Sequence, residues 1–135
     1  MSSKDGLLLS SFSINSIQAF RNTAFTSLSF TEGLQTIGNY AFSDCTKLKD
    51  IVLPATLTSI GTQAFDDYSS SNNNVLLNTI KFKGTTPPTM SSSPFGINKS
   101  TTTSCKIYVP SSAYSAYVTA LKDKNVVGSQ YIVSY

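Results

Sequence analysis

Hydrophobic residues return along this chain with a period of 23 positions, separated by mostly polar residues. Residues 37–42 (IGNYAF) come back as residues 60–65 (IGTQAF). The same shift superimposes further apolar pairs: Phe25 on Leu48, Leu28 on Ile51, Phe30 on Leu53, and Leu34 on Leu57. A period in the twenties indicates a solenoid, in which short units stack because none of them can bury its apolar face alone.

Each repeat predicts one short strand of a shared parallel sheet. Ile51 and Leu53 are expected to face the core while Asp50 and Val52 face water, because side chains alternate along a strand. Five such strands are expected, at residues 7–9, 28–30, 51–53, 80–82 and 107–109. The prediction is a β-rich, right-handed solenoid with about five short parallel strands in one sheet. An ordinary β-sandwich is the alternative, but chance similarity would not keep the apolar positions in register.

The remaining parts of each coil can also be assigned. The strand at 80–82 matches the strand at 51–53 at an offset of 29, and the six extra residues fall in the polar segment 69–74. Such segments are where solenoids tolerate insertions. Phe20, Phe42 and Phe65 each follow an alanine, and we expect them to stack on short helical turns opposite the sheet. The solenoid domain is assigned to residues 1–110.

Residues 111–135 are predicted to form a C-terminal cap helix and tail. The apolar residues Tyr114, Tyr117, Val118 and Leu121 fall at i, i+3, i+4 and i+7, which is one stripe of a helix. The serines at 111–112 follow a proline and offer a hydroxyl for the helix N-terminus. A solenoid needs such a cover over the apolar edge of its last coil. A helix lying on a membrane surface is the alternative, which the small positive charge of the segment disfavours.

Composition excludes several classes of function. The chain has 135 residues, a net charge of +3 and no histidine. The charge is too small and too dispersed for a nucleic-acid-binding stripe, and the common general base and the usual serine or cysteine triads are missing. The seven carboxylates include no pair predicted to face each other across a cleft. We therefore expect no enzyme, no catalytic residue and no cofactor.

Three candidate chemical sites carry simpler interpretations. Cys45 and Cys105 lack the spacing and the histidine partners of a zinc site, and a disulfide between them would have to cross two strands. Buried free thiols are the expected state. Asp66 and Asp67, before the polar insertion, could ligate calcium, although a solvated loop whose acids cap a turn is the favoured interpretation. No metal site is predicted.

The outward positions of the sheet are the best candidates for a binding site. By register they form two ladders, one with Ser27, Asp50, Thr79 and Lys106, the other with Ser29, Val52, Lys81 and Tyr108. Lys83 follows just after the second ladder. The face therefore becomes basic toward the C-terminus, which suits a partner with acidic groups, either a protein or a glycan. The ligand-binding residues expected are Asp50, Val52, Thr79, Lys81, Lys83, Lys106 and Tyr108. Solvated strand residues with no ligand are the competing interpretation.

The repeat resembles a known family. Residues 48–65 read L-x-x-I-x-L-P-x-x-L-x-x-I-G-x-x-A-F, and residues 41–48 read AFSDCTKL. Both are similar to the BspA-type, or Treponema-type, leucine-rich repeat of bacterial surface proteins. The tail, with Thr86 before two prolines and a Tyr-Val-Pro strand at 108–110, resembles Bacteroides-like members. The resemblance implies a leucine-rich-repeat solenoid that is secreted or exposed at the cell surface.

The same resemblance implies a role in adhesion. Relatives are linked to adhesion to host proteins and to other bacteria, so the expected partner is a host or bacterial surface protein, or a glycan. We expect neither nucleic-acid binding nor insertion into a membrane, and we expect the protein to be a monomer. No signal peptide is recognised at the polar start of the chain, so the chain is either cytosolic or a mature region, and the resemblance favours the second. The alternative function is a structural spacer with no ligand of its own.

Overall fold

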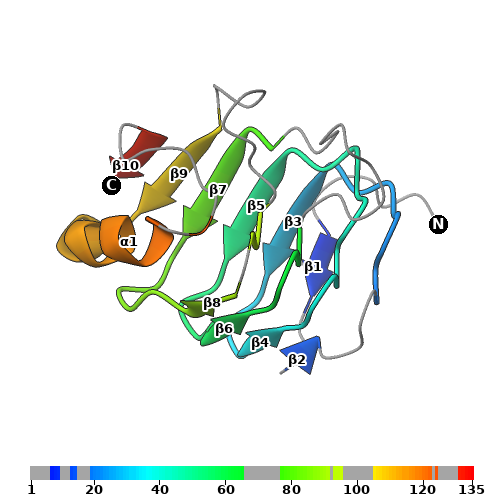
Figure 1. Cartoon of the computed structure of the whole chain (residues 1–135), viewed down its shortest axis with the longest axis horizontal. Helices are drawn as coiled ribbons and strands as arrows, with labels where there is room; N and C mark the ends of the chain where they lie inside the picture. The colour runs from blue at the N-terminus through cyan, green and yellow to red at the C-terminus, as the bar shows by residue number, and fades with distance from the viewer. Residues whose placement is uncertain are drawn as a thin grey trace.

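The larger sheet of the protein has six parallel strands. In the computed structural model these are, in spatial order, β1 (Leu7–Leu9), β3 (Ser27–Phe30), β5 (Asp50–Leu53), β7 (Thr79–Phe82), β9 (Lys106–Val109) and β10 (Ile132–Ser134) (Figure 1). The structure describes residues 7–9, 13–14, 19–65, 77–91, 93–95, 105–122, 124 and 131–135. All five predicted strands are confirmed. The sixth, β10, pairs with β9 in parallel register, Ile132 opposite Ile107, and so extends the sheet beyond the repeats.

Burial along these strands follows the predicted alternation. In β5, Ile51 and Leu53 are fully buried, while Asp50 and Val52 are only half-buried. The offset of 29 is confirmed as well, because Asp50 lies opposite Thr79 and Ile51 opposite Ile80. The polar segment 69–74, to which the extra residues were assigned, lies outside the described residues. The β-sandwich alternative is wrong, since the strand pairs of the described residues are parallel and join neighbouring coils.

A second parallel sheet lies opposite the first. It consists of four two-residue strands, β2 (Ser13–Ile14), β4 (Thr36–Ile37), β6 (Ser59–Ile60) and β8 (Thr89–Met90). The Ala-Phe segments beyond these strands were expected to be short helical turns, and they are turns whose backbone groups bond to the next coil. The Phe42 amide, for example, donates to the Ala64 carbonyl at 2.7 Å. Tyr40 and Gln63 have φ values of 57° and 48°, which interrupt a right-handed helix.

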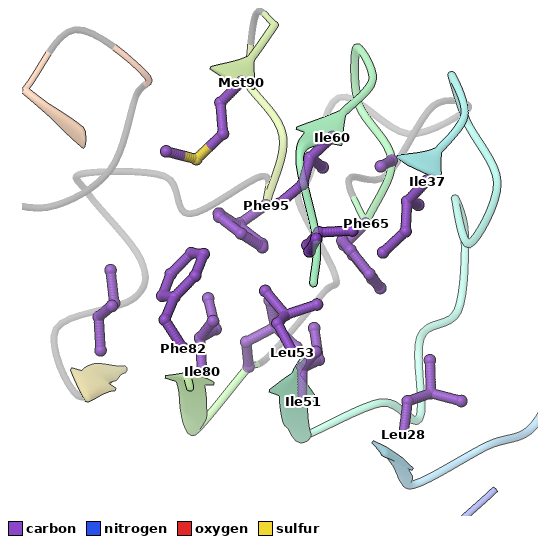
Figure 2. Packing of buried hydrophobic residues seen from close by; sticks show 14 of the residues in the cluster. Leu28, Ile37, Ile51, Leu53, Ile60, Phe65, Ile80, Phe82, Met90 and Phe95 are labelled. Carbon is purple, nitrogen blue, oxygen red and sulfur yellow. The ribbon is translucent and has the colours of Figure 1, made fainter. Parts of the chain in front are cut away.

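Aromatic rings form a continuous stack between the two sheets. The Phe42 ring is parallel to the Phe20 ring at 5.1 Å and to the Phe65 ring at 5.2 Å, so the predicted ladder is confirmed. Phe95 adds a further member, 5.7 Å from Phe65. Figure 2 shows Phe65 and Phe95 between the side chains of the larger sheet, such as Leu53, and those of the smaller one. Stacked rings at these distances add to the stabilisation that burial provides.

Phe95 belongs to a coil that the sequence pattern did not reveal. Met90, Pro94 and Phe95 occupy the places of Ile60, Ala64 and Phe65 in the preceding coil, shifted by 30 positions. The Phe65 amide donates to the Pro94 carbonyl at 2.8 Å, the same bond that joins earlier Ala-Phe turns. Proline replaces the alanine at this position, and the offset is no longer 23, so the motif was missed.

The predicted helix closes the C-terminal end of the solenoid. A 3₁₀ turn, η1 (Ser111–Ala113), leads into α1 (Tyr114–Leu121), which lies beside β9 and β10 (Figure 1). Tyr117 and Leu121 are buried; the Tyr117 ring packs 4.7 Å from the Phe82 ring, and its hydroxyl donates to the Gly84 carbonyl at 2.8 Å. The apolar stripe is thus used inside the protein, and the membrane-surface alternative is wrong. No helix in the described part of the chain is long and apolar enough to span a membrane.

One detail of the cap differs from the prediction. The residue preceding α1 is Ala113, which has no side chain to bond the helix amides, and the Ser111 hydroxyl instead donates to the Tyr135 carbonyl at 2.7 Å. The Ser111 amide donates to the same carbonyl at 2.9 Å. The 3₁₀ turn moves the helix start beyond the serines, and the Ser111 hydroxyl ties Tyr135, which follows β10, to the cap.

Both cysteines are free and buried, as expected, so the disulfide alternative is wrong. Burial raises the pKa of Cys45, and it raises the pKa of Cys105 from 9.0 to about 12, with the nearby Asp50 carboxylate adding to the shift. Cys105 precedes β9 and is fully enclosed. The neutral thiol is therefore part of the folded core, and its ionisation is linked to unfolding.

This linkage predicts a loss of stability in alkali. Between pH 9.0 and about 12 the unfolded thiol of Cys105 is ionised while the folded one keeps its proton. The unfolded state then binds fewer protons, so stability falls as the pH rises, by up to about 1.4 kcal/mol per pH unit. Urea unfolding at about pH 8 and about pH 10 should show a smaller decline for Cys105→Ala than for the wild type. Equal declines would contradict the linkage.

Candidate binding face

The outward residues of the larger sheet form the two predicted ladders, here called the outward face. Backbone pairing places Ser27, Asp50, Thr79 and Lys106 opposite one another across β3, β5, β7 and β9. The second ladder contains Ser29, Val52, Lys81 and Tyr108, and Val133 of β10 continues it. Parallel pairing in register places neighbouring side chains of each ladder about 4.8 Å apart, the spacing between strands, which makes a continuous surface.

Asp50 has a partner inside its own ladder. The Thr79 hydroxyl donates to the Asp50 Oδ1 atom at 2.7 Å, and Ser27 flanks Asp50 on the other side. No second carboxylate faces it on this ladder, so the outward face holds no pair of acids suited to glycoside hydrolysis. Among the described residues no group of three or more histidine, cysteine, aspartate or glutamate side chains is placed to hold a metal ion. Asp66 and Asp67, the candidate calcium ligands, lie outside the described residues.

Lys83 lies apart from the other basic residues of the candidate site. Its Nζ atom is 3.5 Å from the Oε1 atom of Glu32, and both side chains are about half exposed. The same Glu32 carboxylate accepts hydrogen bonds from the amides of Ala55 and Thr56, so three coils meet at this carboxylate. The Lys83 side chain is thus directed to the polar turns at the end of the strands rather than to Lys81 and Tyr108.

Four of the predicted residues converge on one pocket of about 340 Å³. Its lining residues are Val52, Thr79, Lys81, Tyr108 and Tyr135. Val52, Thr79 and Tyr108 come from three adjacent strands, β5, β7 and β9, and Lys81 lies directly opposite Tyr108. The structure therefore brings together Val52, Thr79, Lys81 and Tyr108, while Asp50, Lys83 and Lys106 lie outside the lining.

Tyr135 completes this pocket, and sequence reasoning missed it. Its amide donates to the Val109 carbonyl at 3.0 Å, which continues the β9–β10 ladder. Its ring lies 4.5 Å from the Lys81 Nζ atom, a cation–π contact. About half of the side chain, 49%, remains exposed, more than for any other large hydrophobic residue in the described part of the chain. A wall of the pocket thus comes from outside the repeats.

The position of Tyr135 has a cause in the backbone. In the β5–β7 pair the Lys83 amide donates to the Leu53 carbonyl. The corresponding donor for the Phe82 carbonyl in the β7–β9 pair would be the amide of residue 110, which is a proline and has no N–H. The Tyr135 hydroxyl donates to the Phe82 carbonyl instead, at 2.8 Å. Pro110 is the signal in the sequence from which a substitute donor could have been expected.

The Tyr135 hydroxyl is held in its neutral form. Partial burial raises the pKa of Tyr135, so its hydroxyl stays protonated and keeps donating to Phe82. Lys81 forms no ion pair with any described carboxylate, and neither does Lys106 on the neighbouring strand. The C-terminal half of the outward face therefore carries two uncompensated positive charges beside an aromatic wall.

A second groove, of about 400 Å³, runs along the smaller sheet. Its lining is made of short polar and aliphatic residues and glycines, including Thr36, Ser59 and Thr89 in one ladder. None of its described lining residues is charged or aromatic, so none could anchor a ligand through such a side chain. The pocket on the outward face, which has a lysine and two tyrosines in its lining, is the better candidate for a binding site.

The comparisons with known proteins agree with the repeat assignment. Residues 13–86, more than half of the chain, match a family model whose description is BspA type leucine rich repeat region (6 copies). The match ends before β9 and the cap, so the resemblance noted for the tail stays a prediction, as does a Bacteroides-like source. Searches of the curated proteins and of the solved structures found no match.

Proposed function

Because the chain belongs to the BspA-type leucine-rich repeat family, we propose that it is a binding module of a bacterial cell-surface or secreted protein. It engages a host or bacterial surface protein, or a glycan, through the outward face, and it works as a monomer. No catalytic role is proposed for it, since repeat modules of this kind are typically non-catalytic.

The pocket around Lys81 is the observation that supports this proposal most strongly. Binding energy in protein interfaces concentrates in a few residues, among which tyrosine, tryptophan and arginine are enriched, surrounded by well-packed neighbours. Tyr108 and Tyr135 are two such residues, and Lys81 adds a positive charge that attracts an acidic partner. Two hydrogen bonds, from the Tyr135 amide to the Val109 carbonyl and from its hydroxyl to the Phe82 carbonyl, hold Tyr135 in place. A preformed site costs less conformational entropy on binding than a flexible one.

The experiment is a binding screen of the purified chain. A panel of host matrix proteins, bacterial surface proteins and glycans is tested at low and moderate salt, with the wild type and the triple variant Lys81→Gln, Lys106→Gln, Tyr108→Thr. We expect at least one partner to bind in a salt-sensitive manner, because exposed charges are screened by salt. The triple variant should lose this binding and keep its melting temperature, since all three side chains point outward.

Two outcomes would overturn the proposal. If the folded protein binds no member of the panel, the spacer function is favoured. If the triple variant still binds, the binding site lies elsewhere on the molecule. One observation favours the spacer: the outward positions of β3 are only Ser27 and Ser29, so this part of the outward face offers no large or charged side chain as an anchor. In that case the solenoid would hold another domain at a distance without a ligand of its own.

A further inference from the structure

We infer that the pocket formed by Lys81, Tyr108 and Tyr135 accepts an acidic side chain, flanked by an apolar or aromatic one, from an extended peptide segment of a protein partner. This inference rests on the proposed function and gives the partner a chemistry. Three features of the pocket support it: the kind of hydrogen-bonding groups it offers, the nature of its walls, and its charge.

The pocket offers two polar groups with unused donors, the Lys81 ammonium and the Tyr108 hydroxyl. The Lys81 ammonium lies over the Tyr135 ring, a contact that does not consume its N–H groups, and no described residue accepts a hydrogen bond from it. No hydrogen bond joins the Tyr108 hydroxyl to the described residues either. The Thr79 hydroxyl already donates to Asp50. An anion is the ligand that two unused donors fit best, because charge-assisted hydrogen bonds are the strong ones.

The remaining surface of the pocket is apolar. Val52 and the rings of Tyr108 and Tyr135 line it, and the nearby Asp50 carboxylate lies outside the lining. A glycan presents many hydroxyl groups that need acceptors as well as donors, and the described lining offers only hydroxyl oxygens as acceptors, with no carboxylate or amide side chain. A peptide places a carboxylate beside an apolar side chain and satisfies both parts of the lining.

Charge complementarity extends the same preference beyond the pocket. Lys106 lies one strand from Lys81 and has no ion-pair partner among the described residues, so a second acidic residue of the partner would meet it. Lys83 does not contribute, because Glu32 already neutralises it. The peptide is therefore expected to cross β7 and β9 at the C-terminal end of the outward face.

Tyr135 is the residue that restricts the pocket to one place in the molecule. Its ring stands over Lys81 because its hydroxyl replaces the missing donor of Pro110 and bonds to the Phe82 carbonyl. Within the described residues this arrangement exists at the β7–β9–β10 end alone. The repeats supply the floor and the capping segment supplies the wall, so each molecule is expected to bind one such segment.

Fluorescence polarisation with labelled peptides tests the inference on the full chain. The probes are an extended peptide of alternating Glu and Tyr, its uncharged Gln and Tyr counterpart, an acidic Glu and Ser peptide, and hyaluronate oligosaccharides as an acidic glycan. The Glu and Tyr peptide should bind most tightly. We expect each of the other peptides to bind roughly tenfold more weakly, the effect of one lost charge-assisted bond or one lost aromatic contact.

Variants assign the effect to the pocket. Lys81→Gln should remove the preference for Glu over Gln, while Lys47→Gln, the same charge change on an exposed turn, should retain it. Tyr135→Leu should weaken the binding of the Glu and Tyr peptide about tenfold. If this change also loosens β10, the Lys81→Gln variant still tests the pocket, because Lys81 lies on β7. Equal binding of the Glu and Gln peptides, an unaffected Lys81→Gln variant, or tighter binding of hyaluronate would overturn the inference.

The panel screen separates this inference from the proposed function. A panel partner that is lost in the triple variant, together with no preference for the Glu and Tyr peptide, would refute the acidic segment and leave the binding face standing. If neither a panel member nor any peptide binds, the proposed function and this inference are both refuted.

Discussion

Replacing Phe42 by alanine should destabilise the protein by roughly 3–5 kcal/mol, the range for removing a buried phenylalanine side chain. Phe42 is fully buried and lies in the middle of the aromatic stack, 5.1 Å from Phe20 and 5.2 Å from Phe65. Its ring also meets the edge of Phe30 at 5.6 Å. Since domains of this size are stable by about 5–15 kcal/mol, the variant should be close to unfolding.

The cost is large because a cavity at this position cannot close. Phe42 packs against the coils on both sides and against the larger sheet, and the coils are fixed by backbone bonds such as that from the Phe42 amide to the Ala64 carbonyl. In a solenoid each coil is stabilised by its neighbours. Loss of the central ring therefore weakens two interfaces between coils, and we expect the urea transition to broaden as well as to shift.

Urea unfolding followed by circular dichroism measures this effect. Phe25→Ala is the matched control, because Phe25 is only partly buried and meets Phe20 at 6.4 Å at the edge of the stack. It should lose clearly less stability than Phe42→Ala, in proportion to the smaller area that it buries. Equal losses for the two variants would show that Phe42 does not hold the central place in the stack.

The repeat itself could be predicted from the sequence because two adjacent coils have the same length. From Phe25 to Phe65 every core position of one coil is repeated 23 residues later, and alternation then assigns each neighbour to the inside or the outside. In a solenoid each strand pairs with the strand of the next repeat, so a short repeated pattern is enough to predict which strands pair and in which register. The register of Asp50 with Thr79 followed from the same pattern once an insertion was allowed.

Features that depend on departures from the repeat could not be predicted in this way. The smaller sheet depends on pairs of two-residue strands, such as Thr36 and Ile37 with Ser59 and Ile60, which are too short to show alternation. Tyr135 reaches the outward face because Pro110 cannot donate a backbone hydrogen bond, a consequence of tertiary pairing. Four pocket residues were therefore predicted, and the fifth was not.

Replacing Gly61 by alanine should destabilise the protein by about 3 kcal/mol or more, the upper end of the cost of overpacking a close contact. A Cβ atom at this position would lie 2.5 Å from the Asn39 amide nitrogen and 2.6 Å from the Gly38 carbonyl carbon. Both are backbone atoms of the preceding coil, so they cannot turn aside. The coils would have to separate, which would weaken the bond from the Gly61 amide to the Ile37 carbonyl, now 2.8 Å long.

Gly84→Ala is the matched control for this change. Its Cβ atom would approach the Ala55 carbonyl oxygen at 3.2 Å, a contact that a small shift relieves. Neither Gly61 nor Gly84 has a φ in the left-handed region, so both variants gain the same benefit from a less flexible unfolded chain. The difference between their urea midpoints therefore isolates the contact between coils. Similar midpoints would mean that the two coils can accommodate a Cβ atom at position 61 and that the 2.5 Å contact is relieved without cost. A much lower midpoint for Gly61→Ala would establish that the glycine sets the spacing of these coils.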